Sequence, residues 1–202
     1  MAGPQSPPPP DPTPRAGSAA RREIEALDVA VYAAISATDT PTVDRFAAAL
    51  SRAADGSKLW MGAAGLLAAT GPLGRRAAVD GLASVAVTSA VVNLLLKPRW
   101  HRRRPDREAH RVPLARQVDM PRSTSFPSGH AASAFAFATG VARELPLAAV
   151  PLQAAASLVA YSRVHTGVHY PIDVIAGGAV GRALAPLTTE ALGRCRISRR
   201  LR

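Results

Sequence analysis

The sequence contains little cysteine and few aromatic residues. Cys195 is the only cysteine among 202 residues, which excludes an intramolecular disulfide. Aromatic residues account for 4% of the chain, although 48% of it is hydrophobic. The apolar residues are mostly Ala, Val and Leu, a composition that favours closely packed helices over a sheet. We therefore expect an all-α protein with one domain.

The N-terminal region also lacks the apolar segment and small-residue cleavage site of a secretory signal peptide. Residues 1–20 are instead rich in proline and polar side chains, so we expect a disordered tail there. The main domain is expected to span residues 21–192, followed by a basic C-terminal tail over residues 193–202.

Acidic residues are scarce as well: the chain has 14 Asp and Glu against 25 Lys and Arg, a net charge of +11. Such an excess is typical of proteins that bind nucleic acid, an anionic membrane surface or a phosphate-bearing substrate. One basic run, residues 97–122, lies between apolar segments, and other arginines flank further apolar segments, as they do in membrane proteins. No motif that contacts a DNA groove accompanies them. The charge distribution therefore favours a membrane.

Four stretches contain no Asp, Glu, Lys or Arg: residues 59–74, 81–96, 123–142 and 145–162. Each approaches or reaches the roughly 17 to 25 residues that cross a bilayer as a helix. Two further stretches, residues 24–38 and 171–189, are interrupted by isolated charges. We predict a bundle of six transmembrane helices, with a short amphipathic helix within residues 41–58. A soluble helical bundle is the alternative, but residues 83–96 carry too few polar side chains for a solvated face.

Lys97 and Arg104 form the first of three charged clusters. Lys97 ends a predicted apolar helix, Pro98 favours a loop after it, and Arg104-Pro105 follows within that loop. A lysine and an arginine that enter one site from a helix end and its loop can neutralise a phosphoryl group. Alone, the pattern is more typical of basic anchors beside a membrane helix.

Pro127-Ser128-Gly129-His130 is the second cluster, at the predicted start of an apolar helix. Ser128 is a good N-cap and Gly129 permits close backbone approach, so free amides there can hold phosphate oxygens. His130 would then lie beside the phosphate and can donate a proton to a leaving alkoxide. A plain helix cap with an uninvolved histidine explains this tetrapeptide equally well.

Ser162-Arg163, His169 and Asp173 form the third cluster. Pro171 suits the first turn of a helix, so Asp173 falls in that turn and can reach back to the ring of His169. An aspartate bonded to one imidazole nitrogen fixes the tautomer and leaves the other nitrogen free to attack. An isolated aspartate at a helix start is more often a cap, but this one has a histidine and an arginine nearby.

The three clusters lie at ends of predicted helices, and the order of the helices brings all of them to the same membrane face. Together, Lys97-x6-Arg104-Pro105, Pro127-Ser128-Gly129-His130 and Ser162-Arg163-x5-His169-x3-Asp173 resemble the signature blocks of the type 2 phosphatidic acid phosphatase superfamily. The likeness extends over about residues 24–189. Asp44-Arg45 and Ser51-Arg52-Ala53-Ala54 are similar to actinobacterial members.

The resemblance implies a six-transmembrane-helix fold, shared with vanadium haloperoxidases, and a role for each residue. His169 would attack phosphorus to form a phosphohistidine, His130 would protonate the leaving group and Asp173 would orient His169. The phosphate-binding residues would be Lys97, Arg104, Ser128, Gly129 and Arg163. The resemblance also implies no required metal or other cofactor, because cationic side chains and amides stabilise the developing charge.

We therefore expect an integral-membrane hydrolase that dephosphorylates a lipid, with polyprenyl diphosphate or polyprenyl-phosphosugar phosphate ahead of phosphatidate. Its partners would be this substrate and the membrane, without nucleic acid, and the sequence leaves the oligomeric state open. We expect a multi-pass protein of the cell membrane whose active site faces away from the cytoplasm. The alternatives are a basic membrane- or nucleic-acid-binding protein with an inactive site, and a vanadate-dependent haloperoxidase.

Several basic residues fall outside the three blocks. We assign His101, His110 and His165 to packing or solvent. Four arginines of the basic run are expected to contact lipid headgroups, a further phosphate or solvent: Arg99, Arg102, Arg103 and Arg107.

Overall fold

A computed structural model describes residues 16–200, and the regular elements within that range are all helical. The α-helices are α1 (Ala16–Ala37), α2 (Pro41–Ala53), α3 (Lys58–Ala69), α4 (Pro72–Ala90), α5 (Gly129–Ala142), α6 (Pro146–His165) and α7 (Pro171–Arg200). Short 3-10 or π turns cover Asp55–Ser57, Val91–Leu96, Lys97–Arg99 and Leu114–Arg116. The prediction of an all-α fold is therefore confirmed.

The six predicted apolar helices correspond to α1, α3, α4 with its π turn, α5, α6 and α7, and the predicted amphipathic segment contains α2. Several boundaries differ. Helix α3 ends at Ala69, within the predicted stretch 59–74, and α4 begins at Pro72, nine residues before the predicted stretch 81–96. Helix α5 begins at Gly129, whereas the predicted stretch begins at residue 123. The side chain of Ser128 accepts a hydrogen bond from the amide of Ala131, so this residue caps the helix and the six residues from 123 lie outside it.

Both predicted tails are shorter than expected within the described residues. Helix α1 begins at Ala16, so residues 16–20 of the predicted N-terminal tail are helical, and residues 1–15 lie outside the described range. Helix α7 continues through residue 193 to Arg200. Basic side chains near a helix C-terminus interact favourably with the helix dipole, so the basic composition that suggested a tail also suits a helix end.

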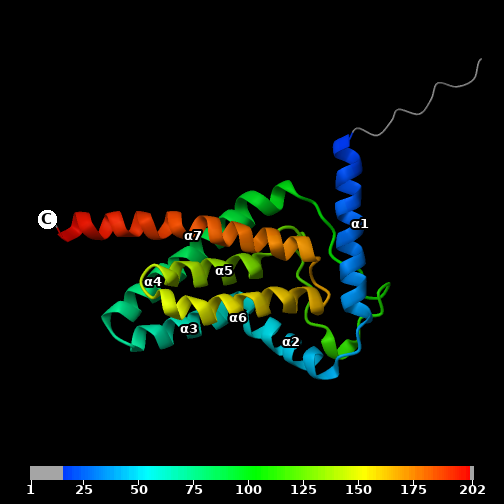
Figure 1. Cartoon of the computed structure of the whole chain (residues 1–202), viewed down its shortest axis with the longest axis horizontal. Helices are drawn as coiled ribbons and strands as arrows, with labels where there is room; N and C mark the ends of the chain where they lie inside the picture. The colour runs from blue at the N-terminus through cyan, green and yellow to red at the C-terminus, as the bar shows by residue number, and fades with distance from the viewer. Residues whose placement is uncertain (1–15, 201–202) are drawn as a thin grey trace, which may run out of the picture.

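Helix α5 forms the centre of the bundle, with α4, α6 and α7 packed around it (Figure 1). Helix α7 approaches α5 through two glycines. A Cβ atom added to Gly177 would lie 2.3 Å from the carbonyl oxygen of Ser128, and one added to Gly181 would lie 2.2 Å from that of Ala132. The contact is therefore possible only without a side chain, as the small-residue composition suggests.

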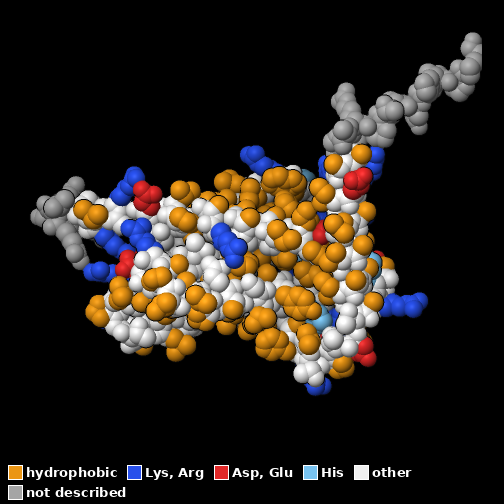
Figure 2. Space-filling model, viewed as in Figure 1, with side chains coloured by type: hydrophobic (Ala, Val, Ile, Leu, Met, Phe, Trp, Pro, Cys, Tyr) orange, Lys and Arg blue, Asp and Glu red, His pale blue; other side chains and the backbone are white. Residues whose placement is uncertain are grey.

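The outer surface of the bundle is largely apolar. Hydrophobic side chains cover much of it in Figure 2, whereas most charged side chains lie toward its two ends. Large apolar side chains such as Leu66, Leu94 and Leu147 are more than two-thirds exposed. Among the described residues, two helices, Pro72–Arg99 and Pro146–His165, are long and apolar enough to cross a membrane. Exposed apolar surface of this kind suits contact with lipid.

Helix α1 is steeply inclined to α5, α6 and α7 and contacts one end of the bundle (Figure 1). It is anchored there by polar contacts of Asp28, whose carboxylate accepts a hydrogen bond from the amide of Ile172 at 2.8 Å. Tyr32 packs edge-on against Tyr170, with ring centroids 5.4 Å apart. These contacts place α1 next to the first turn of α7, where the predicted third cluster lies.

Candidate active site

The three predicted clusters meet at the end of the bundle that α1 contacts. A Cβ atom added to Gly129 would lie 3.7 Å from the Nζ atom of Lys97, so the first and second clusters are adjacent. Arg104 lies 3.2 Å from a ring nitrogen of His169, which joins the first cluster to the third. The sequence-based expectation of one composite site agrees with this geometry.

His169 occupies the loop between α6 and α7, and its side chain is 1% exposed. Nε2 lies 3.2 Å from Nη1 of Arg104, and Nδ1 lies 3.4 Å from Oδ2 of Asp173. A guanidinium group can only donate hydrogen bonds, so Nε2 is the acceptor and Nδ1 carries the proton. Asp173 therefore selects the tautomer in which the lone pair of Nε2 points toward Arg104.

Burial lowers the pKa of His169 to about 3, and the positive charge of Arg104 acts in the same direction. The hydrogen bond with Asp173 opposes this shift but is the weaker influence. The imidazole is consequently neutral near pH 7, the state that a nitrogen nucleophile requires.

Asp173 is fully buried in the first turn of α7. Besides His169, its Oδ2 atom accepts hydrogen bonds from the hydroxyl of Ser125 and, at 2.9 Å, from the amide of Tyr170. Its other oxygen, Oδ1, accepts a hydrogen bond from Arg102 at 2.8 Å. With both oxygens engaged, the carboxylate has a fixed orientation toward the imidazole.

Arg102 continues the contact to helix α1, where its other terminal nitrogen lies 2.6 Å from Oδ2 of Asp28. The interpretation of Arg102 as a contact for lipid headgroups or solvent is wrong, because its guanidinium bridges two buried carboxylates. Sequence reasoning also missed Asp28 as a member of the site. The available signal was its charge within residues 24–38, a stretch predicted to cross the membrane.

Three cationic side chains, Lys97, Arg104 and Arg163, surround the space next to His169, and we call them the cation cluster. Lys97 donates a hydrogen bond to Ser123 at 3.1 Å. Arg104 is held by the carbonyl oxygens of Ser123 at 2.9 Å and Val168 at 2.7 Å. The backbone thus fixes the guanidinium beside Nε2, and burial lowers the pKa of Arg104.

Arg163, at the C-terminal end of α6, is 1% exposed and donates to the hydroxyl of Ser51. Its Nε atom is buried and has no hydrogen-bond partner within the described residues. A buried donor on a cationic group is costly to leave unpaired, so an anion next to Arg163 would satisfy it.

At the start of α5, the protein already uses some of the backbone donors. The amide of Ser128 donates to the carbonyl of Asp173 at 2.9 Å, and the amide of Ala131 donates to the hydroxyl of Ser128. An anion at this helix start would therefore meet the amides of Gly129 and His130. In the structure, the hydroxyl of Ser128 caps α5 and its amide connects that helix to α7.

His130, in the first turn of α5, lies with Nε2 2.8 Å from Oδ1 of Asp55. Asp55 comes from the turn between α2 and α3, and the same oxygen is 3.6 Å from Nη1 of Arg163. Arg163 therefore lies near both histidines: Asp55 connects its guanidinium to His130, and its carbonyl accepts a hydrogen bond from the amide of His169 at 3.2 Å. Sequence reasoning did not identify Asp55.

Several further basic residues have structural contacts. His165 is buried, with Nε2 2.7 Å from Asp44, which also accepts a hydrogen bond from the fully buried Arg116 at 2.9 Å. Arg107 donates to the carbonyls of Gly167 at 3.3 Å and Val118 at 2.7 Å, so its assignment to lipid or solvent is wrong. His110 packs edge-on against Tyr32, as its assignment to packing predicts.

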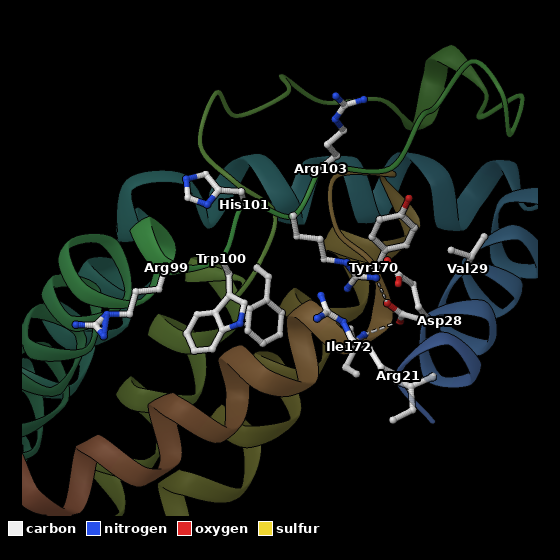
Figure 3. Close-up of a pocket in the computed structure, with 13 residues that line it drawn as sticks. Arg21, Asp28, Val29, Arg99, Trp100, His101, Arg103, Tyr170 and Ile172 are labelled. Atoms are coloured by element: carbon white, nitrogen blue, oxygen red, sulfur yellow. Dashed lines mark hydrogen bonds and ion pairs between the residues drawn. The ribbon is translucent and has the colours of Figure 1, made fainter. Parts of the chain in front are cut away.

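A groove of about 860 Å³ lies between α1, the segment from Arg99 to Arg103 and the start of α7. In Figure 3, Asp28, Tyr170 and Ile172 lie on one side of it, and Arg99, Trp100 and His101 lie on the other. Arg21 and Arg103 also line the groove. Cationic, aromatic and aliphatic side chains thus share one open surface next to Asp173.

Among the described residues, no group of three or more His, Cys, Asp or Glu side chains is arranged to hold a metal ion.

Comparison with known proteins adds a family and several relatives. The model of the PAP2 superfamily matches residues 77–196. Decaprenylphosphoryl-5-phosphoribose phosphatase of Mycobacterium tuberculosis is 36% identical over 177 residues, which cover 87% of this chain and 93% of that protein. Lipid A 1-phosphatase of Rhizobium johnstonii is 42% identical over 71 residues, covering 35% of this chain and 29% of that protein.

Two solved structures share the fold. The transmembrane PAP2-type phosphatidylglycerolphosphate phosphatase of Bacillus subtilis superposes with a TM-score of 0.65 at 23% identity, covering 85% of this chain and 87% of that one. LpxE of Aquifex aeolicus superposes with a TM-score of 0.63 at 24% identity, covering 81% of this chain and 95% of that one.

Proposed function

This chain belongs to the PAP2 superfamily and is a membrane phosphatase of lipid phosphates, and we propose that it acts on a polyprenyl-phosphosugar phosphate through a phosphohistidine on His169. The observation that carries the proposed chemistry is the neutral, buried imidazole of His169 between Asp173 and Arg104. No other imidazole of the site combines an orienting carboxylate with a lone pair directed at a cation.

In the proposed mechanism, the terminal phosphate of the substrate binds to the cation cluster and to the amides of Gly129 and His130. Nε2 of His169 attacks phosphorus, and the bond from phosphorus to the lipid oxygen breaks. His130 donates a proton to that oxygen, which leaves as an alcohol. In the second half of the reaction, His130 accepts a proton from water, whose oxygen attacks the phosphohistidine and releases inorganic phosphate. Asp173 orients His169 in both steps.

The proposed substrate class rests on how much of this chain each curated relative matches. The match to the decaprenylphosphoryl-5-phosphoribose phosphatase covers nearly the whole of both chains, whereas the match to the lipid A 1-phosphatase covers about a third. The groove next to α1 supports a lipid substrate, because its arginines suit an anionic headgroup and its apolar side chains suit the start of the lipid chain.

We further propose that the chain crosses the cell membrane several times, with the active site on the extracytoplasmic face. The number of arginines at that end is unusual for this face, but Arg102, Arg104, Arg107 and Arg116 are bound to groups of the protein itself. Arg194 and Arg196, near the opposite end of α7, would then lie on the cytoplasmic side.

The activity is tested with protein purified in detergent and a panel of lipid phosphates. We expect phosphate release to be fastest from a polyprenyl-phosphosugar phosphate, to be abolished in His169→Ala and to be unchanged in Arg194→Ala, a variant of an exposed arginine near the opposite end of α7. Equal, slow release by wild type and His169→Ala would contradict the proposal. Salt-dependent DNA binding without phosphate release would support a basic binding protein instead.

Orientation is tested by thiol labelling of intact cells. Leu114 is 85% exposed at the active-site end, whereas Cys195 is exposed near the other end of α7. A membrane-impermeant reagent should label Leu114→Cys in a Cys195→Ser background and leave the wild-type protein unlabelled. The reverse pattern would place the active site in the cytoplasm.

A further inference from the structure

Each of the two site histidines is paired with a carboxylate from a different part of the chain. Asp173 follows His169 by four residues, whereas Asp55 is separated from His130 by 75 residues. Asp55 belongs to none of the three sequence clusters. Its contact with His130, at 2.8 Å, is shorter than that between Asp173 and His169, at 3.4 Å.

The position of Asp55 is determined by the turn between α2 and α3. Gly56 and Ser57 both have φ of 61°, a left-handed conformation that separates α2 from α3. Ala54 on one side and Trp60 on the other are buried in the core, so both ends of the turn are anchored. The carboxylate is thereby held at the edge of the site, where it is about half exposed.

The charges around His130 act in opposite directions. Lys97, from the turn after α4, and Arg163, from α6, are both cationic and disfavour an imidazolium next to them. Asp55 is the one carboxylate within ion-pair distance of His130 among the described residues. A general acid must carry a proton before the bond to the leaving group breaks, so this site requires a negative charge that favours the imidazolium.

We propose that Asp55 is the positioning residue of the proton donor His130. Its carboxylate accepts the Nε2 hydrogen, so the ring is held with Nδ1 available to the leaving oxygen, and its negative charge favours the protonated ring that donates. When the bond from phosphorus to oxygen breaks, the Nδ1 proton moves to that oxygen and His130 becomes neutral, while Nε2–H stays bonded to Asp55. The proton that His130 later takes from water restores the starting state. This inference rests on the proposed function, in which His130 is the acid.

Each histidine is paired with an aspartate, but the proposed roles differ: His169 attacks phosphorus and His130 donates a proton. The Asp173–His169 pair is buried beside Arg104, and the imidazole there is unprotonated. The Asp55–His130 pair is more exposed, with 23% of the His130 side chain accessible, so its ring can exchange protons with water between turnovers.

The test compares two leaving groups. An alkyl phosphate such as the lipid substrate needs a proton on its leaving oxygen, whereas p-nitrophenyl phosphate releases a weakly basic phenolate that does not. Asp55→Asn should lower kcat for the lipid by about 10- to 100-fold, less than the loss of the general acid itself would cause, because His130 remains. It should lower kcat for p-nitrophenyl phosphate by less than about threefold, and Asp39→Asn, a variant of an exposed aspartate, should change neither.

Three further measurements make the test decisive. Asp55→Asn should move the alkaline limb of the kcat profile for the lipid to lower pH, and it should have no further effect in a His130→Gln background. Asp55→Glu should restore part of the selectivity between the leaving groups, which separates a charge effect from misfolding. Equal losses for both leaving groups, additive effects with His130→Gln, or a lower KM with unchanged kcat would overturn the role of Asp55. If wild type hydrolyses neither compound, the proposed function itself fails.

Discussion

Arg102 donates a hydrogen bond to Asp173 at 2.8 Å, on the side of the carboxylate that faces away from His169. The same guanidinium contacts Asp28 of α1 at 2.6 Å. Helix α1 is thus connected to the imidazole through one arginine and one aspartate. Helix α1 lies outside the central bundle, and this connection is one means by which its position affects the site (Figure 1).

Asp173→Asn should separate orientation from phosphate binding. An asparagine side chain can present its amide hydrogens to Nδ1, which would then act as acceptor and leave the proton on Nε2, where the attacking lone pair is needed. We expect kcat to fall by at least about 100-fold with little change in the inhibition constant of inorganic phosphate. Steady-state kinetics with phosphate as competing ligand measures both, and a kcat within tenfold of wild type would contradict the assigned role.

Arg102→Ala should affect catalysis without removing a group from the phosphate-binding site. Its loss leaves Asp28 and Asp173 buried without their shared cation, so the carboxylate next to His169 is no longer fixed. We expect kcat to fall by about 10- to 100-fold and the melting temperature to decrease. Arg194→Ala, a variant of an exposed arginine near the opposite end of α7, is the control. Equal effects of the two variants would show that the bridge to Asp173 is irrelevant.

The stability of the protein should decrease as the pH falls below neutrality, in part because of His169. Its folded-state pKa of about 3 lies below the value of about 6.5 in an unfolded chain, so the unfolded state binds more protons between these values. The contribution of this group is complete above pH 6.5 and decreases by up to about 1.4 kcal/mol per pH unit below it. The melting temperature of wild type should therefore fall relative to that of His169→Gln from pH 7 to 5; a constant difference would exclude a neutral buried imidazole.

The residues proposed to perform the chemistry could be predicted from the sequence, but the residues that support them could not. His169 and Asp173 are four positions apart, so a helix start between them is enough to predict their contact. Asp55 and Asp28 reach the site from distant parts of the chain, and the contact between Asp28 and Ile172 bridges 144 positions. Contacts of this range depend on how the helices pack, which periodicity along one sequence does not determine.

Helix positions and helix boundaries also differ in how well the sequence predicts them. The apolar stretches located the helices, because hydrophobic composition is a local property. Residues 123–128 are uncharged, like the rest of the predicted stretch, so composition alone did not separate them from α5. Their conformation is determined by contacts with other elements: the carbonyl oxygens of Ser123 and Thr124 both accept hydrogen bonds from Arg104. A local pattern therefore places a helix but not its first residue.

Gly177→Ala tests whether the contact between α7 and α5 sets the geometry of the site. The added methyl group would lie 2.3 Å from the carbonyl oxygen of Ser128, which is backbone and cannot rotate away. Helix α7 would have to shift, and with it Asp173, whose own carbonyl accepts the amide hydrogen of Ser128. We expect a lower melting temperature and a loss of phosphate release of at least tenfold.

Gly65→Ala is the matched control for this substitution, because a Cβ atom there meets nothing within 4 Å. An alanine within a helix restricts the unfolded chain more than glycine does, so this variant should be neutral or more stable by about 0.4 to 1 kcal/mol, with unchanged activity. If Gly177→Ala behaved like Gly65→Ala, the two helices could separate without disturbing His169, and Asp173 would owe its position to Arg102 and Ser125 rather than to the packing of α7 on α5.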